Sequence, residues 1–278
     1  MSMDMKPGEF VPLWGGTPPE LHLKPETDKN WKPTIAYFPV TRGKPKGTII
    51  VYPGGAYIGR APHEGVPVAK AFNAFGFSTF VVDYRCSNEC KQPLFDGPLR
   101  DAARAVRFVR AHADGFGIPP NKIATLGFSA GAHLVSTLAV HHAKADAKDA
   151  DKDGFAKVSS RPEAVLPCYG VILSGALAHR GSIQTLAGDD PEWTKWADIP
   201  ANVTSQTPPV FLWHTLGDIG VPVENSLRFA DALRTSNVPF ALHIFTNGPH
   251  GIGLAETDPE AKEWPGLAAR WLEYTVFV

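Results

Sequence analysis

The sequence predicts an α/β fold, in which a mostly parallel central sheet is covered by helices on both faces. Short β-rich runs alternate along the chain with longer stretches of helical periodicity, as expected for successive βαβ units. The clearest β-rich run, Thr48 to Tyr52, is continuous rather than alternating, which is typical of a parallel strand buried on both faces. The pentapeptide at 127–131, which joins a predicted strand to a predicted helix, narrows the class further.

The N-terminal part of the chain predicts an arm followed by the first strands and helices of the sheet. Residues 1–33 are rich in Pro, Gly and Trp and lack periodicity, so we expect an extended arm that wraps the domain. Strands are expected at 34–40, 48–52 and 77–83, with a helix at 64–75 between the last two. A second helix begins near Pro98, and its apolar stripe consists of Leu99, Ala102, Val106, Val109 and Ala113.

The C-terminal half continues the same alternation. A strand at 122–126 leads into the pentapeptide, and a helix is expected over 132–142. Residues 144–161 are polar and charged, so we expect an exposed loop there. The remaining predictions are strands at 164–173, 210–214 and 240–245, a small cap at 174–207, a helix from Pro222 and a closing helix over 267–278. No internal repeat divides the chain, and residues 1–278 are expected to form one domain.

Composition narrows the classes of partner and compartment. The formal net charge is −1 and no basic patch stands out, so neither nucleic acid nor an anionic membrane is an expected partner. Three cysteines are too few for a disulfide framework, and although Cys86 and Cys90 are close enough in sequence to pair, buried idle thiols are favoured. Met1 to Phe10 has no apolar core of signal-peptide length, so a cytoplasmic protein is expected unless a signal was removed beforehand.

The pentapeptide Gly127-Phe128-Ser129-Ala130-Gly131 has the form of the nucleophile elbow of an α/β hydrolase, G-x-S-x-G between a strand and a helix. The turn is tight, so the residues two before and two after the serine cannot carry bulky side chains, and both are glycine. The turn holds the serine hydroxyl at the N-terminus of the next helix, where backbone N–H groups and the helix dipole favour an oxyanion. The motif therefore predicts Ser129 as a catalytic nucleophile, with a chance glycine turn as the alternative.

A serine nucleophile requires a base within hydrogen-bond reach, and the base requires an acid that orients it. In this fold the acid and then the histidine follow the serine in sequence, each on a loop after a strand. Asp218 lies in the loop after the strand at 210–214, and His250 lies between two glycine-rich turns after the strand at 240–245. We therefore predict Ser129 as nucleophile, His250 as general base and then acid, and Asp218 as the orienting carboxylate.

Other histidines and aspartates are weaker candidates for these roles. His214 and His243 lie in predicted strands, where we expect them to satisfy local hydrogen bonds, and His133 lies one helical turn past the serine, where a structural role is expected. The competing acids are Asp189, Asp190 and Asp198 in the predicted cap, and Asp258 after the histidine loop. None of these aspartates has the strand-end position of Asp218.

An oxyanion hole requires hydrogen-bond donors preset where negative charge develops. One donor is expected to be the N–H of Ala130, the residue after the nucleophile. The others are assigned to Gly55 and Ala56 in the Pro-Gly-Gly-Ala-Tyr segment that follows the strand at 48–52, since glycine lets the backbone approach a substrate closely. A plain Pro-Gly turn is the alternative interpretation of this segment.

Aromatic and imidazole side chains near these loops are candidates for the substrate pocket. Tyr57, Trp193, Trp196 and Trp213 are candidate pocket or sugar-stacking aromatics, and ordinary core positions are the alternative for each. His179 lies in the predicted cap and is a better candidate for lining the pocket than for acting as the base.

A possible calcium loop in the charged segment is tested and set aside. Asp149, Asp151 and Asp153 match the start of such a loop, but the ninth position is Lys157 and the twelfth, which requires a bidentate Glu, is Ser160. A solvated charged loop is therefore favoured, and no metal site is predicted.

Six segments taken together are similar to a known family of enzymes. They are Tyr52–Tyr57, Val82–Arg85, Gly127–Leu134, Ser160–Pro162, Val221–Leu227 and Pro249–Gly251. With them the chain, from about Ile35 onward, resembles the α/β-hydrolase carbohydrate esterases related to the bifunctional feruloyl and acetyl-xylan esterases, cousins of the hormone-sensitive-lipase-like group. The resemblance implies hydrolysis of short acyl esters, typically acetyl groups on xylan or its oligosaccharides, without a metal or other cofactor. Small-molecule or oligosaccharide esters are then the expected partners.

Two positions depart from that family pattern. Ala56 stands where relatives usually carry a third glycine, and the acid loop reads Leu216-Gly217-Asp218 where relatives often show two adjacent aspartates, which leaves Asp218 as the sole carboxylate. Two alternatives to a short-chain carbohydrate esterase stay open: a peptidase or longer-chain lipase on the same fold, and a non-catalytic α/β-hydrolase-fold binding protein. The second alternative is disfavoured because all three triad candidates are present.

Overall fold

The computed structural model describes residues 5–278, so the first four residues of the expected N-terminal arm lie outside it. Within this part of the chain, eight strands form one sheet in the order β1-β2-β4-β3-β5-β6-β7-β8. The strands are β1 (Phe10–Pro12), β2 (Thr34–Phe38), β3 (Thr48–Tyr52), β4 (Ser78–Asp83), β5 (Ile123–Phe128), β6 (Ala164–Cys168), β7 (Val210–Thr215) and β8 (Phe240–Phe245). β2 pairs antiparallel with both β1 and β4, and all other pairs, from β4 to β8, are parallel. The predicted mostly parallel sheet is confirmed.

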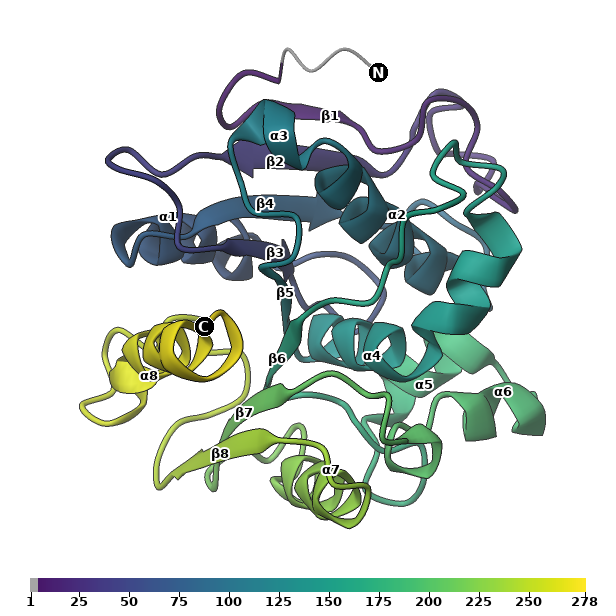
Figure 1. Ribbon diagram of the computed structural model, residues 1–278. Coiled ribbons are helices and arrows are strands. Elements are labelled where there is room, and N and C mark those ends of the chain that lie inside the picture. Colours follow the sequence, from purple (N-terminus) through teal and green to yellow (C-terminus); the bar gives the residue numbers. More distant parts are fainter. Residues whose placement is uncertain (1–4) are drawn as a thin grey trace.

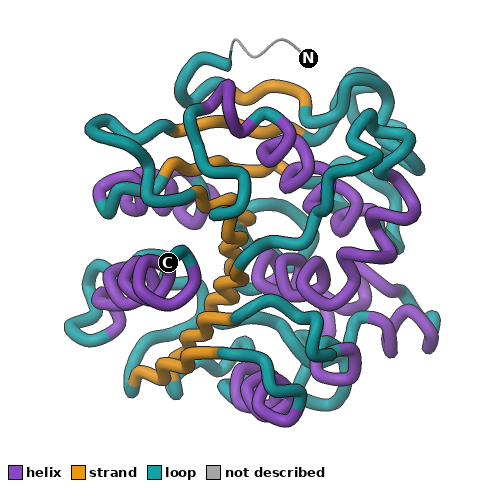
Figure 2. Tube along the Cα trace, in the orientation of Figure 1, coloured by secondary structure: helices purple, strands orange, loops and turns teal. Residues whose placement is uncertain are grey.

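Helices cover both faces of this sheet (Figures 1 and 2). α1 (Val66–Ala74) and α8 (Trp264–Trp271) lie on one face, whereas α2 (Gly97–Ala111), α4 (Ala130–Asp149) and α7 (Glu224–Thr235) lie on the other. Shorter helical segments are η1 (Pro62–Glu64), α3 (Ala113–Phe116), α5 (Arg180–Ala187), α6 (Pro191–Trp196), η2 (Pro200–Asn202), η3 (Ala261–Glu263) and η4 (Leu272–Val276). The sheet twists from β1 at the top of Figure 1 to β8 at the bottom, between the two helix layers.

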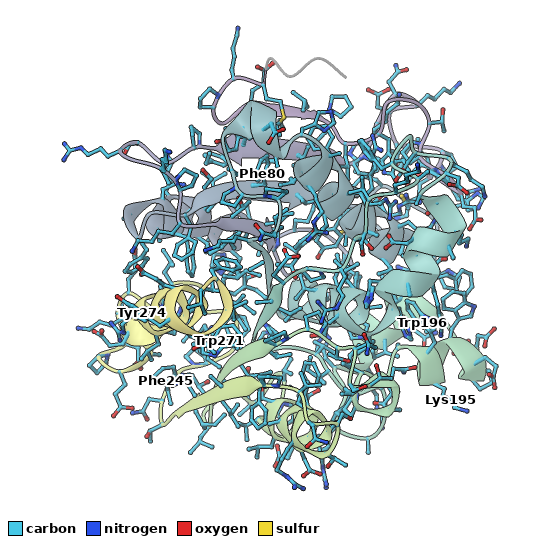
Figure 3. The ribbon with its side chains drawn as sticks, in the orientation of Figure 1. Phe80, Lys195, Trp196, Phe245, Trp271 and Tyr274 are labelled. Carbon is cyan, nitrogen blue, oxygen red and sulfur yellow. The ribbon has the colours of Figure 1, made fainter. Side chains whose placement is uncertain are left out.

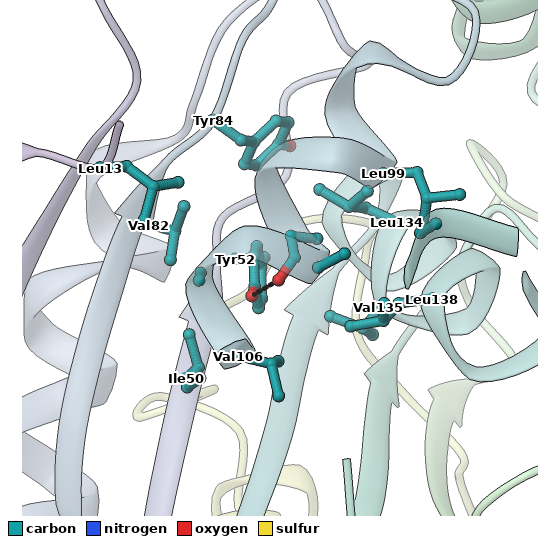
Figure 4. Packing of buried hydrophobic residues seen from close by; sticks show 14 of the residues in the cluster. Leu13, Ile50, Tyr52, Val82, Tyr84, Leu99, Val106, Leu134, Val135 and Leu138 are labelled. Atoms are coloured by element: carbon teal, nitrogen blue, oxygen red, sulfur yellow. Dashed lines mark hydrogen bonds between the residues drawn. The ribbon is translucent and has the colours of Figure 1, made fainter. Parts of the chain in front are cut away.

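Alternating side chains of the central strands build a core on each face. Ile50 and Tyr52 of β3 have no exposed surface and pack in the cluster formed with α2 and α4 (Figure 4). Their neighbours Ile49 and Val51 belong to the cluster on the opposite face, beneath α1 and α8. Because both sets of side chains are removed from water, both faces of the strand contribute hydrophobic stabilisation, which explains its unbroken apolar pattern.

Two expected boundaries are wrong. The strand expected over 164–173 ends at Cys168, because Tyr169 adopts a φ of 37°, in the left-handed region that a strand does not accommodate. The helix after the elbow is longer than expected and runs to Asp149. The arm is extended as expected, and its strand β1 pairs with β2. The cap contains the short helices α5 and α6.

The charged segment that was expected to be an exposed loop is partly helical and partly buried. Asp149 is buried and accepts two hydrogen bonds from Arg100 of α2, at 2.6 and 2.5 Å. The carboxylate of Asp153 is also fully buried and pairs with Arg107, two turns further along the same helix. The solvated-loop expectation is therefore wrong for these two aspartates and holds for Asp151, which is exposed. Residues 5–278 contain no group of three or more His, Cys, Asp and Glu side chains arranged to hold a metal ion.

Two further expectations concern the cysteines and membrane-spanning segments. Cys86, Cys90 and Cys168 are free and buried, as expected for idle thiols. In the described part of the chain, no helix combines the length and apolar character that crossing a membrane requires.

Candidate active site

The residues around Ser129 form a turn that only glycine-flanked sequences can make. Ser129 stands between the end of β5 and the start of α4, with φ 51° and ψ −114°. A Cβ added to Gly127 would lie 2.1 Å from the carbonyl oxygen of Gly131, and one added to Gly131 would lie 2.1 Å from that of Tyr52. No side chain tolerates such distances, so the two glycines let β5, α4 and β3 come close enough to shape the turn.

Three side chains from distant parts of the sequence meet in a hydrogen-bonded chain at this turn. Nε2 of His250 lies 2.8 Å from Oγ of Ser129, and Nδ1 of His250 lies 2.7 Å from Oδ2 of Asp218. Asp218 follows β7 and His250 follows β8, so all three residues lie at the carboxyl edge of the parallel strands. With Nδ1–H donating to the carboxylate, Nε2 is left to accept the serine proton. Ser129 retains 9% of its surface exposed and the His250 side chain 29%, so solvent and small molecules reach this chain of groups.

The carboxylate of Asp218 is held ionised by its surroundings. Its Oδ1 accepts hydrogen bonds from the N–H groups of Gly220 and Val221, at 2.9 and 2.8 Å. Burial opposes ionisation, but hydrogen bonds from His214, His250 and the Val221 N–H outweigh it and hold the pKa of the Asp218 carboxyl well below its usual range. A permanently charged acceptor therefore faces Nδ1 of His250.

His214 is a second imidazole on this carboxylate, and its position was not foreseen. As expected for a strand residue, it is buried and its Nε2 lies 2.9 Å from the Val221 carbonyl oxygen. The same Nε2 also lies 3.3 Å from Oδ2 of Asp218, while Nδ1 lies 2.8 Å from the Ser226 hydroxyl. The i, i+4 spacing of His214 and Asp218 at the end of a strand is the one signal in the sequence that could have suggested the contact.

The loop that carries Gly55 and Ala56 packs against the serine. Gly55 and Ala56 both have positive φ, 133° and 56°, in the loop after β3. A Cβ on the preceding Gly54 would lie 2.9 Å from Cβ of Ser129, which shows how closely this loop packs against the serine. Among residues 5–278, no acceptor is paired with the N–H of Gly55, Ala56 or Ala130. These groups are therefore free to donate to a substrate oxygen.

Comparison with known proteins adds the family to this geometry. Residues 36–233 match the model of the BD-FAE family, and this match covers most of the chain. The chain belongs to the BD-FAE family. Its architecture is that of the α/β hydrolases, in agreement with the fold predicted from the elbow.

Two proteins that are similar in sequence to this BD-FAE chain are named as a xylanase and an ester hydrolase. Endo-1,4-beta-xylanase B of Butyrivibrio fibrisolvens is 40% identical over 220 residues, which are 78% of this chain and 34% of that protein. Acetylxylan esterase of Xylanibacter ruminicola is 29% identical over 219 residues, 76% of this chain and 42% of that protein. The chain thus spans between a third and a half of the length of these two relatives.

A solved structure extends over the whole BD-FAE chain. The acetyl ester-xyloside bifunctional hydrolase from Caldicellulosiruptor lactoaceticus is 41% identical, with a TM-score of 0.87 and coverage of 100% of both chains. By their names, the acetylxylan esterase and this acetyl ester-xyloside hydrolase act on carboxylic esters.

Two of the aromatic residues predicted to line the pocket of this BD-FAE protein are core residues instead. Trp213 has no exposed surface and stacks on Trp264, with ring centroids 5.1 Å apart, so it cannot touch a substrate. Tyr57 is 1% exposed, and its hydroxyl lies 2.7 Å from Nδ1 of His133. Tyr57 therefore anchors the loop that carries Gly55 and Ala56 to α4, and His133 has the structural role expected for it.

The two cap tryptophans lie apart from the serine. Trp193 and Trp196 of α6 line a cavity of about 350 Å³ together with Lys144, Glu192, Lys195, Ala201 and Asn202. Trp196 stacks on His141, which is three turns of α4 beyond Ser129, and Figure 3 shows Trp196 and Lys195 at the edge of the molecule, on α6. His179 is the N-cap of α5, where its ring accepts a hydrogen bond from the Ser182 N–H. Trp193 and Trp196 therefore stay candidates for substrate contact only beyond the acyl site, and His179 stays a candidate for lining the pocket.

Proposed function

We propose that this chain is a serine esterase that removes short acyl groups, acetyl above all, from carbohydrates such as xylan oligosaccharides. The observation that carries the proposal is the hydrogen-bonded chain from Ser129 through His250 to Asp218, with free N–H groups beside the serine. The carbohydrate ester is suggested by two similar proteins, one named an acetylxylan esterase and the other an acetyl ester-xyloside bifunctional hydrolase.

The first half of the proposed reaction acylates the serine. Oγ of Ser129 attacks the ester carbonyl carbon as its proton passes to Nε2 of His250, and the charge of Asp218 stabilises the imidazolium that forms. The carbonyl oxygen becomes an oxyanion that accepts hydrogen bonds from the N–H groups of Gly55, Ala56 and Ala130, each worth about 3 kcal/mol in the transition state. His250 then protonates the sugar oxygen, the C–O bond breaks and the alcohol leaves.

The second half hydrolyses the acyl-enzyme. A water molecule loses a proton to Nε2 of His250 and attacks the acyl carbon, and the oxyanion forms again at the same N–H groups. Collapse of this intermediate returns the proton to Oγ of Ser129 and releases the carboxylic acid. The same donors and the same base serve both halves, so one geometry is sufficient for the cycle.

The direct test of the proposal is Ser129→Ala assayed with p-nitrophenyl acetate. Because the hydroxyl is the attacking group and its removal leaves the glycine framework intact, kcat is expected to fall by about 10⁴-fold or more with little change in melting temperature. Wild-type protein is expected to be labelled by a fluorophosphonate probe and the variant not. A variant that hydrolyses the ester at a rate near the wild type would rule out Ser129 as nucleophile.

Substrate class is tested separately from mechanism. Acetate release from acetylated xylo-oligosaccharides is compared with hydrolysis of butyryl, longer acyl, feruloyl and peptide substrates under the same conditions. The proposal predicts the highest kcat/KM for acetyl esters of the oligosaccharides. Faster cleavage of long acyl esters or peptides would favour a lipase or a peptidase on this fold.

A further inference from the structure

Glu64 is a buried carboxylate that lies between the two loops that meet at the serine. It is the last residue of η1, and its side chain is 3% exposed. Its hydrogen-bond partners are the N–H of Gly54 in the oxyanion loop and the hydroxyl of Tyr169. Neither carboxylate oxygen bonds to a residue of the triad. Nothing in the sequence pattern marks this residue, which is the first residue of the helix predicted over 64–75.

One oxygen of Glu64 holds the oxyanion loop. Oε2 accepts a hydrogen bond from the N–H of Gly54, 2.7 Å away. Gly54 is the residue whose missing side chain lets the loop pack against Cβ of Ser129, and it directly precedes Gly55 and Ala56. The carboxylate therefore fixes the loop at the point from which the proposed oxyanion donors extend.

The other oxygen of Glu64 reaches the histidine loop through one phenol. Oε1 accepts a hydrogen bond from the Tyr169 hydroxyl at 2.7 Å, and the Tyr169 oxygen accepts one from the N–H of Gly253 at 2.8 Å. The Tyr169 ring also packs edge-on against the imidazole of His250, with centroids 5.2 Å apart and an interplanar angle of 72°. Tyr169 thus touches the imidazole directly and holds the backbone of its loop.

A neighbouring contact ties the same segments a second time. Nε2 of His63, the residue before Glu64 in η1, lies 2.8 Å from the carbonyl oxygen of Gly251. The segment η1 is therefore bonded to the loop of His250 at both Gly251 and, through Tyr169, Gly253.

The charge on Glu64 is unusual for a residue with a purely structural role. Both oxygens accept hydrogen bonds, so the arrangement is that of a carboxylate, and no Lys or Arg of the described residues pairs with it. Burial and the nearby Glu64 charge raise the pKa of Tyr169 well above its usual value, so the phenol keeps the proton that it donates. The nearest basic group is the exposed His63 imidazole, whose Nε2 lies 3.7 Å from Oε1. A buried carboxylate that has neutral donors and no Lys or Arg partner is costly, so its presence supports a role beyond packing.

We propose that Glu64 and Tyr169 are positioning residues that fix the oxyanion loop and His250 relative to each other. The inference rests on the proposed esterase function. Neither residue hydrogen-bonds to Ser129, His250 or Asp218. Glu64 acts through Gly54 and Tyr169, and Tyr169 acts through Gly253 and by packing against the His250 ring. Their loss is therefore expected to lower kcat, because displacements of about 1 Å in such groups can cost 10²-fold, while KM changes little.

The test compares Glu64→Gln and Tyr169→Phe with wild type on p-nitrophenyl acetate, with active sites counted by fluorophosphonate titration. A Gln of the same size cannot accept both bonds, so kcat is expected to fall by about 10- to 100-fold with KM within about threefold. Tyr169→Phe leaves the hydrogen bond from Gly54 to Glu64 in place, so a smaller loss, about tenfold, is expected. Because the two residues act through one hydrogen bond, the double variant is expected to lose less than the product of the two single effects.

Glu163→Gln is the matched control. Glu163 also accepts a backbone bond, from the Ile123 N–H at 2.9 Å, and side-chain bonds from Arg110, but at the amino ends of β5 and β6, away from Ser129. Its substitution is expected to lower the melting temperature and leave kcat per active site unchanged.

The outcomes separate this inference from the function beneath it. If Glu64→Gln behaves like the control and loses only melting temperature, the positioning role is wrong even though Ser129→Ala is inactive. If the losses of Glu64→Gln and Tyr169→Phe simply multiply, the two residues do not act as a pair. If Ser129→Ala itself stays active, the failure lies in the proposed function.

Discussion

Buried carboxylates occur in two regions of this protein, and they are held in different ways. Beside α2, Asp149 and Asp153 are bonded to Arg100 and Arg107, so each buried negative charge faces a permanent positive one. At the carboxyl edge of the sheet, Asp218 accepts its hydrogen bonds from backbone N–H groups and imidazoles, without a Lys or Arg. In an ion pair the guanidinium neutralises the charge of the carboxylate, and the pair stabilises the structure. A carboxylate held by dipoles keeps its charge available for an imidazolium that forms during a reaction.

The backbone differs between the two regions in the same sense. α2 and α4 are regular helices, whereas the carboxyl edge concentrates positive φ values at non-glycine residues, among them Ala56, Ser129 and Tyr169. Each such residue costs about 1 to 3 kcal/mol and persists only where the surroundings over-determine it. The parallel strands supply that support, because β3, β5 and β6 are adjacent in the sheet and fully buried.

The largest effect that would break the comparison is expected for Asp218→Asn. The amide keeps the size of the side chain but presents N–H groups to His250, which forces the wrong imidazole tautomer. We expect kcat for p-nitrophenyl acetate to fall by about 10³- to 10⁴-fold. The free energy of unfolding is expected to change by only about 1 kcal/mol, since the variant loses hydrogen bonds but leaves no unpaired cation. Activity within tenfold of wild type would show that the charge of Asp218 is not used.

The opposite result is expected for Asp149→Asn. Here the substitution puts a neutral group opposite Arg100, whose side chain is 2% exposed, and leaves it only the exposed Glu20 carboxylate, 3.0 Å away, as a charged partner. We expect a loss of about 3 to 5 kcal/mol in the free energy of unfolding, measured by denaturant titration, with kcat per titrated active site unchanged. The double variant Arg100→Met, Asp149→Leu sharpens the test, since removing both charges is expected to recover much of that loss. A fall in kcat with intact stability would erase the distinction between the regions.

Most of the fold was predictable because its signals are local. Strand runs, helical stripes and the G-x-S-x-G turn are read within a few residues of each other, and the order of acid and histidine after the serine selected Asp218 and His250. The burial of Asp149 was missed because its partner, Arg100, is 49 residues away and only the packing of α4 on α2 brings them together. Charge alone suggested solvent, since an isolated carboxylate is rarely buried.

The residues that support the site could not be predicted from the sequence, because their contacts are also long-range. Glu64 and Tyr169 are 105 residues apart, and no motif joins them. Trp213 was considered for the pocket because aromatic residues near an active-site loop often contact substrate, but its place inside β7 directs the side chain into the core beneath α8. Side-chain direction in a strand depends on register, and register is set by the neighbouring strands rather than by the residue itself.

The smallest expected effect is a loss of folding stability at low pH, and it extends the comparison to a buried neutral group. His133 is fully buried near the site, and burial lowers its pKa to about 4 from an ordinary value of 6.5, although its bond to the Ala197 carbonyl opposes the shift. The unfolded chain therefore takes up this proton between pH 6.5 and 4 while the folded protein does not, so stability present at pH 7 is lost as the pH falls. Between pH 7 and pH 5 the contribution amounts to about 2 kcal/mol.

His133→Gln removes the titration, while His141, whose pKa is lowered to about 4 in the same way, is unchanged in both proteins. Denaturant titrations at the two pH values are expected to show a drop in unfolding free energy about 2 kcal/mol larger for wild type than for the variant, and equal drops would mean that His133 is protonated in the folded protein.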